Sequence, residues 1–361
     1  MINSVLRESK PSLFVKFRIF SKLLPASPGT TGIPSLDAHL TFNSPFHVSS
    51  GASLQRGEVI EIQGPAASGK THLSYCLTMR CTLPKDVTLY PKESNSYQTA
   101  KIVDIGGWHK SAVILDTDGR WSAQRLKVLF YNYLRGLFPP DYEEYQPTIS
   151  ELVDLSLNRV HIFRPTSTAS LLATISGLPV YHAENMQTEE ISLVAIDSIS
   201  SFYWTDRYTS EQRHPSDKKE NSSLLGQVLM GLQELRLRYG FVTMLNNWGL
   251  SLISSGSSKP GQSQTGGSSP FFRQHLHPFP APFEIPARIL LNANLFPPIT
   301  LHITLSLPPI SWIPSETATL QNANQHGLGK VPKTERTGIL RIVENGKTST
   351  FTFNIDGEEV V

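Results

Sequence analysis

The sequence has 361 residues, of which 39% are hydrophobic, so the chain can bury a sizeable core as one large domain or one domain with attachments. Its 32 basic and 30 acidic residues leave a formal net charge of +2, so the overall charge gives no argument for nucleic acid and any DNA contact must come from a local patch. Two cysteines without metal-ligand spacing exclude a disulfide framework and favour a reducing interior, and no apolar run reaches the roughly 18 residues that a membrane span needs.

Residues 1–28 predict a basic N-terminal arm that ends at Pro25 and Pro28. The simplest interpretation is a solvated arm, whereas a mitochondrial presequence and a docking helix share the same pattern and stay open. The segment has no clear apolar core followed by a small-residue cleavage site, so we do not expect a secretory signal. A single acid, Glu8, opposes five basic residues, which are Arg7, Lys10, Lys16, Arg18 and Lys22.

After this arm, apolar runs alternate with helical patterns. Strands are predicted at 59–62, 112–115, 160–163, 191–196 and 241–245. The spacing of apolar residues predicts helices at 72–83, 125–137 and 222–238, and the start of another at 170. Strands that alternate with helices form βαβ units, so we expect an α/β fold with a mostly parallel sheet and helices on both faces.

Two segments interrupt this alternation. Residues 84–110 are polar and irregular in pattern, and residues 251–282 are rich in Ser, Gly, Gln and Pro. We therefore expect the arm at 1–28 to be followed by one core at 29–361, with insertions at about 84–110 and 251–282.

The C-terminal part of the chain predicts strands added at the sheet edge. Apolar runs fall at 288–295, 299–307, 338–343 and 350–355. Within the second run, Thr300, His302 and Thr304 alternate with apolar residues, which is typical of half-exposed strands, so we expect antiparallel C-terminal edge strands. The segment Glu344-Asn345-Gly346-Lys347 predicts a hairpin turn between the last two strands.

A phosphate-binding motif follows the first predicted strand. The pattern G-x-x-x-x-G-K-[ST] is matched at every fixed position, with a strand before it and a helix after it. Backbone N–H groups and the positive end of the following helix can cradle an anion there, and the lysine can reach the β- and γ-phosphates. The sequence therefore predicts an ATP site, with a chance Gly-rich loop as the alternative. Its residues are Gly64, Pro65, Ala66, Ala67, Ser68, Gly69, Lys70 and Thr71.

A magnesium ion beside the phosphates needs oxygen ligands. The Thr71 hydroxyl is one, and Asp197 ends the apolar run 191–196, where ligands sit in open α/β sheets. An ordinary turn aspartate is the alternative for Asp197. A group that positions the attacking water is also needed, and Asp116 and Asp118 both follow the strand at 112–115. One of these two aspartates equally suits a turn-capping role.

In this order the motifs resemble the RecA-type recombinases of eukaryotes. The likeness covers roughly residues 30–355 in outline and is specific at residues 31–37, 57–62, 116–119 and 245–247. It implies a RecA-like P-loop core that binds ATP and Mg²⁺. It also implies that Asp118 stands where the family has its catalytic Glu, and that Asn247 stands where it has the Gln that senses the γ-phosphate.

The segments 78–85 and 197–207 further resemble a recombinase paralogue that forms no filaments. Within the second segment, Phe202, Tyr203 and Trp204 equally suit buried packing. Asp118 and Asn247 are each one methylene shorter than the family residue, which withdraws a water-orienting group by about 1.5 Å. The tethering motif Phe-x-x-Ala is absent from the sequence, and too few residues precede Thr31 for the family's N-terminal helical domain.

The resemblance thus implies an accessory subunit in double-strand break repair by homologous recombination. Its expected partners are other recombinase paralogues in a hetero-oligomer, and single-stranded or branched DNA; its expected location is the nucleus. A DNA contact is expected in residues 248–286, which hold basic and aromatic side chains, although a disordered linker is the alternative. A P-loop ATPase or kinase of another class, and an interaction protein with a vestigial P-loop, are the competing hypotheses.

Overall fold

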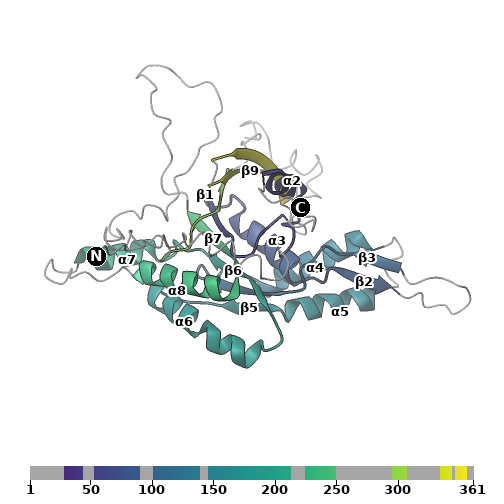
Figure 1. Ribbon diagram of the computed structural model, residues 1–361, viewed down its shortest axis with the longest axis horizontal. Helices are drawn as coiled ribbons and strands as arrows, with labels where there is room; N and C mark the ends of the chain where they lie inside the picture. Colours follow the sequence, from purple (N-terminus) through teal and green to yellow (C-terminus); the bar gives the residue numbers. More distant parts are fainter. Residues whose placement is uncertain are drawn as a thin grey trace, which may run out of the picture.

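One mostly parallel sheet forms the centre of the fold (Figure 1). The computed structural model describes residues 28–43, 53–89, 101–138, 145–212, 224–248, 295–306, 334–343 and 346–355. Within them the main sheet has eight strands in the order β10-β9-β8-β1-β7-β6-β4-β5. The strands are β1 (Val59–Gly64), β4 (Ser111–Asp116), β5 (Val160–Phe163), β6 (Ile191–Asp197), β7 (Val242–Trp248), β8 (Leu301–Leu305), β9 (Thr334–Ile342) and β10 (Thr348–Ile355).

The six strands from β8 to β5 pair in parallel. Every residue of β1, β4 and β6 is buried, because helices cover both faces of the sheet. The strands predicted at 59–62, 112–115, 160–163, 191–196 and 241–245 are confirmed. So is the α/β fold class, with its parallel sheet and its antiparallel strands at the C-terminal edge.

Two hydrophobic clusters fill the space between the sheet and its helices. Helices α2, α3, α4 and α5 contribute to the cluster on one face, and α6 and α8 contribute to the cluster on the other. Successive strand residues alternate between the two clusters, as with Ile114 and Leu115 of β4. The helices are α2 (Pro34–Asn43), α3 (Lys70–Thr82), α4 (Ala123–Leu137), α5 (Gln146–Leu157), α6 (Thr168–Asn185), α7 (Tyr203–Gln212) and α8 (Leu224–Tyr239).

The C-terminal strands correct one expectation and confirm another. β9 pairs antiparallel with both β8 and β10, as predicted. β8 also pairs in parallel with β1 on its other side and is buried along its whole length, so the prediction of a half-exposed strand is wrong for it. The polar residues that alternate with apolar ones in this strand suggested exposure, but His302 and Thr304 are buried.

The polar segment 84–110 is also more regular than expected. β2 (Asp86–Leu89) and β3 (Lys101–Asp104) pair antiparallel as a separate two-stranded sheet. The prediction of an irregular segment failed because few residues of these two strands are buried, so they show no apolar run.

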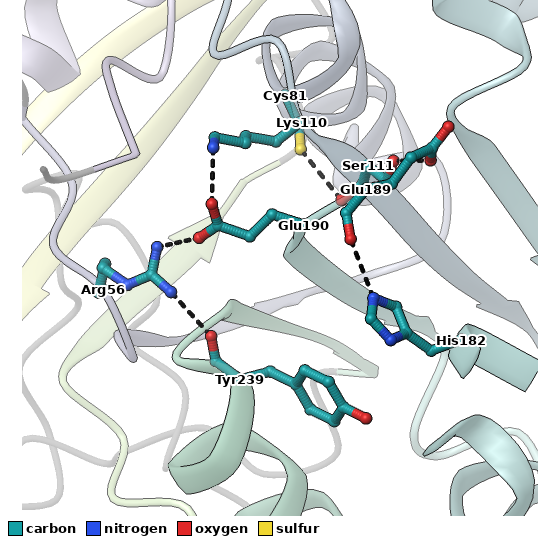
Figure 2. Close-up of polar contacts among 8 residues, drawn as sticks. All are labelled: Arg56, Cys81, Lys110, Ser111, His182, Glu189, Glu190 and Tyr239. Carbon is teal, nitrogen blue, oxygen red and sulfur yellow. Dashed lines mark hydrogen bonds and ion pairs between the residues drawn. The ribbon is translucent and has the colours of Figure 1, made fainter. Parts of the chain in front are cut away.

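Polar contacts join the segments that lead into four of the parallel strands, and Figure 2 shows the side chains that make them. Glu190, just before β6, accepts hydrogen bonds from Arg56, which precedes β1, and from Lys110 Nζ at 2.6 Å. Arg56 Nη2 also donates to the Tyr239 carbonyl at 2.9 Å. This network links the segments that precede β1, β4, β6 and β7.

Several predicted segments fall outside the described residues. These are the arm up to residue 27, the segment 251–282, the strand expected at 288–295 except for its last residue, and the turn residues 344 and 345. None of the described helices is both long enough and apolar enough to span a membrane.

Candidate nucleotide-binding site

The phosphate motif forms the turn between β1 and α3. Lys70, in the first turn of α3, donates from Nζ to the carbonyl oxygens of Gly64 and Pro65, both at 2.8 Å. The ammonium therefore lies inside the curve of the loop. Gly69 caps the helix with a φ of 103°, and Ala67 has a φ of 62°, a left-handed conformation that non-glycine residues seldom adopt. Such strain is concentrated at sites where a loop must hold a defined shape.

The loop has no space for larger side chains at its glycines. A Cβ on Gly64 would lie 2.5 Å from Ser68 Oγ and 2.8 Å from the carbonyl oxygen of Leu305. Ser68 itself is fully buried, and its hydroxyl has no hydrogen-bond partner within the described part of the chain. A buried donor of this kind, at a helix N-terminus, fits a phosphate oxygen as its partner.

Asp197 is the last residue of β6, and its side chain lies beside Thr71 of the P-loop. Its carboxylate, on a residue only 4% exposed, is hydrogen bonded by Thr71, by Asn246 and by the indole of Trp121. Burial raises the pKa of Asp197, and these three hydrogen bonds act in the opposite direction. A hydroxyl and a carboxylate oxygen brought together in this way are ligands that suit Mg²⁺.

The charge of Lys70 depends on this acidic neighbourhood. Burial lowers the pKa of Lys70 from 10.5 to about 8, and the charges of Asp197 and Asp118 counteract part of that effect. A phosphate bound against the ammonium would favour its charged form further.

The two aspartates at the carboxyl end of β4 have different contacts in the structure: Asp116 is its last residue, and Asp118 follows it. Asp116 accepts hydrogen bonds from the backbone N–H groups of Arg120, at 3.0 Å, and of Trp121, at 3.2 Å. It also forms an ion pair with Arg164 at 3.3 Å. It is therefore the turn-capping residue of the two. Asp118 accepts a hydrogen bond from the Ser201 hydroxyl, and its position as a water-orienting residue stays a prediction.

The neighbouring asparagines Asn246 and Asn247 point to opposite faces of the sheet. Asn246 Nδ2 donates to Ser74 Oγ on α3 at 2.8 Å. Asn247 Nδ2 donates to Glu61 Oε1 on β1 at 3.1 Å, and Asn247 pairs in register with Gln63, the residue just before the P-loop. The sequence placed Asn247 near the site, but gave no signal for its buried acidic partner.

Other residues at the site were missed or misplaced by the sequence analysis. Trp121 and Ser201 contact the predicted acids. Trp121 lies in an irregular loop outside every motif, and the resemblance of the segment 197–207 did not indicate that Ser201 contacts Asp118. Trp204, for which buried packing was one interpretation, is 55% exposed on α7, so that interpretation is wrong for it. Phe202 and Tyr203 are partly buried.

A P-loop at the end of a central parallel strand, with the buried Asp197 at the end of a strand two positions away, is consistent with a RecA-like α/β core. No protein-family model matches the sequence. The chain is 27% identical over 189 residues to DNA repair protein XRCC2 of Mus musculus, covering 52% of this chain and 53% of that protein. Over 206 residues it is 27% identical to the DNA repair protein XRCC2 homolog of Arabidopsis thaliana, covering 51% of each.

A third relative carries the name RAD51 rather than XRCC2. Over 232 residues the chain is 22% identical to DNA repair protein RAD51 of Saccharomyces cerevisiae, covering 63% of this chain and 44% of that protein. The chain spans about half the length of the curated relatives it matches. In sequence, the chain therefore resembles RecA-type recombinase paralogues, with XRCC2 among them.

Proposed function

We propose that this chain is an ATP-binding accessory subunit in DNA double-strand break repair by homologous recombination. The observation that carries the proposal is the convergence of Lys70, Thr71 and Asp197 at a strained P-loop, in a chain whose relatives are named as DNA repair proteins. The relatives support a role in recombination repair, and the geometry supports nucleotide binding.

Each part of the P-loop has a distinct task in the proposed site. The backbone N–H groups of residues 66–71 and the Ser68 hydroxyl hold the β- and γ-phosphates, and the Lys70 ammonium offsets their charge. Thr71 and Asp197 hold Mg²⁺, which neutralises charge on the phosphate oxygens when bound. Trp121 keeps the Asp197 carboxylate aimed at the loop.

We expect hydrolysis to be slow. Asp118 is short for a residue that must orient water, and its carboxylate already accepts from Ser201. Asn247 is likewise short for a γ-phosphate sensor, and its amide N–H already donates a hydrogen bond to Glu61. Misplacement of such groups by about 1 Å can cost on the order of a hundredfold in rate.

The proposed assembly is a hetero-oligomer with other recombinase paralogues in the nucleus. In it, residues 29–361 form one nucleotide-binding core, and the apolar, basic arm at 1–28 docks on a neighbouring subunit. DNA, single-stranded or branched, is proposed to contact the segment 248–286, whose basic and aromatic residues suit phosphates and bases.

Affinity purification from the source cell, with mass spectrometry of the co-purified proteins, tests the class. Recovery of other recombinase paralogues is the expected result, and recovery of none would contradict the proposal. Light scattering on the purified chain with ATP and single-stranded DNA tests the assembly. Long filaments of this chain alone would contradict an accessory role, whereas a small oligomer that grows only when a paralogue is added would support it.

A further inference from the structure

A patch of buried polar side chains crosses three central strands beside the P-loop. Its members lie on β7, β1 and β8, on the sheet face turned away from α3, because Ile60 and Ile62 fill the opposite face. None of them is more than 2% exposed. We call this set the central polar cluster, and its members are Glu61, Gln63, Asn247, His302 and Thr304.

Glu61 is the centre of this cluster. Its Oε1 accepts from Asn247 Nδ2 at 3.1 Å and from Gln63 Nε2 at 3.0 Å. Its Oε2 lies 3.9 Å from His302 Nε2 on β8. One carboxylate therefore contacts the strand on either side of it, and one of those contacts is the residue at the sensor position.

A fully buried carboxylate is a poor way to stabilise a sheet. Removing a carboxylate from water costs several kcal/mol, and hydrogen bonds and charge partners seldom return more than that cost, so apolar residues of similar size stabilise as well or better. Val59, on the same face of β1, shows that this face of the strand also accepts an apolar residue. The position of Glu61 therefore points to a role other than packing.

We propose that Glu61 is a positioning residue that holds the Asn247 amide and competes for it with the terminal phosphate of a bound triphosphate. This inference rests on the nucleotide-binding function proposed above. A carboxylate and a phosphate oxygen are both anionic acceptors. The Asn247 amide nitrogen carries two N–H groups, so the competition is over the position of the amide: an amide held against Glu61 must move away from it to reach the γ-phosphate. Glu61 thereby weakens the binding of triphosphate relative to diphosphate.

The competition affects only the last phosphate. A diphosphate carries no γ-phosphate and makes no demand on Asn247, so its affinity does not depend on the Glu61 contact. The ratio of the two affinities, Kd for ADP divided by Kd for ATPγS, therefore isolates the effect of Glu61 from general damage to the P-loop.

The test is Glu61→Gln, which keeps the shape and one acceptor oxygen but removes the charge. A hydrogen bond to a charged group is stronger than one to a neutral group by about tenfold in equilibrium constant or somewhat less. We therefore expect the ratio, measured with Mg²⁺ by calorimetry, to rise about three- to tenfold. In an Asn247→Ala background the same substitution should leave the ratio unchanged. The matched control is Thr243→Val, a buried change of the same shape on the same face of β7, which should leave the ratio at its wild-type value.

An unchanged or lower ratio in Glu61→Gln, or a rise that persists in the Asn247→Ala background, would overturn the inference while leaving nucleotide binding intact. If the wild-type chain binds neither nucleotide, the proposed function itself fails, and the inference fails with it. A second measurement needs no change at Glu61. The Asn247 side-chain amide resonance, assigned by its loss in Asn247→Ala, should shift with ATPγS and stay in place with ADP; a resonance that neither nucleotide moves would also overturn the inference.

Discussion

The indole of Trp121 donates a hydrogen bond from Nε1 to Asp197 Oδ2 at 3.1 Å, so a residue in the loop after β4 fixes the proposed magnesium-side acid at the end of β6. The Trp121 ring is itself held against Tyr75 of α3, with 4.2 Å between ring centroids. The acid is therefore positioned by packing on the helix that follows the P-loop.

The variant Trp121→Phe tests this arrangement. It keeps an aromatic ring but leaves a buried carboxylate without one donor, which costs about 1–3 kcal/mol. We expect a lower free energy of unfolding by about that amount, and a weaker dependence of ATP binding on Mg²⁺, measured by denaturant titration and by nucleotide binding at varied Mg²⁺ concentration. Trp204→Phe, at an exposed tryptophan, is the control. If both variants behave alike, Trp121 does not position Asp197.

The lowered pKa of Lys70 predicts how ATP affinity depends on pH. In the free protein this pKa is about 8, so the ammonium loses its proton as the pH rises through 8, whereas a bound phosphate favours the charged form. ATP affinity should therefore fall above pH 8, and binding at pH 9 should take up close to one proton. Calorimetry in buffers of different ionisation enthalpy measures that uptake. In Lys70→Arg the guanidinium stays charged, so proton uptake there should vanish; equal uptake in both proteins would exclude Lys70 as its source.

The Arg56–Glu190–Lys110 network predicts an acid-sensitive contribution to stability. Its two basic partners hold the pKa of Glu190 below the ordinary value of 4.5, despite the opposing effect of burial. The network's contribution to the free energy of unfolding is fully present above pH 4.5, and it is lost as the pH falls through the lower pKa that Glu190 has in the folded state. We expect Glu190→Gln to lower the melting temperature at pH 7 and to flatten its fall in acid. Glu184→Gln, at an exposed position of α6, is the control. Equal melting curves for Glu190→Gln and wild type would contradict the role of this network.

Turnover should lie below the typical enzyme range, which begins at about 1 per second. The physical reason is the short reach of Asp118, and Asp118→Glu restores about 1.5 Å of that reach. We expect this variant to hydrolyse ATP about 10- to 100-fold faster than wild type, in a phosphate-release assay with Mg²⁺. A wild-type chain that turns over at several per second without partners, or a glutamate variant that is no faster, would contradict this explanation.

The parts of the fold that the sequence predicted are those with a one-dimensional signature. The central strands were found because burial on both faces favours short apolar runs, as in residues 193–196 of β6. The alternation in β8 was misinterpreted because buried polar residues, His302 among them, resemble exposed ones in sequence. α7 was missed because its sequence, Tyr203–Gln212, is mostly polar and has no apolar face of helical period.

The same distinction holds at the candidate site. Lys70 and Thr71 were predicted by fixed spacing along a single loop, since the P-loop is a local structure. Trp121 could not be predicted, because its contact with Asp197 joins residues 76 positions apart and depends on the order of the strands. Sequence spacing also left the roles of Asp116 and Asp118 open, and the hydrogen bonds to Asp116 identify it as the turn cap.

The central claim is that residues 64–71 bind the phosphates of a nucleoside triphosphate through Lys70. The most direct test is the affinity of a fluorescent ATP analogue, with Mg²⁺, for the wild-type chain and for Lys70→Ala, with Lys127→Ala on the exposed side of α4 as the matched control. Loss of a charge-assisted contact to phosphate should raise Kd by about tenfold or more in Lys70→Ala and leave it unchanged in Lys127→Ala. Equal binding by wild type and Lys70→Ala would contradict the account.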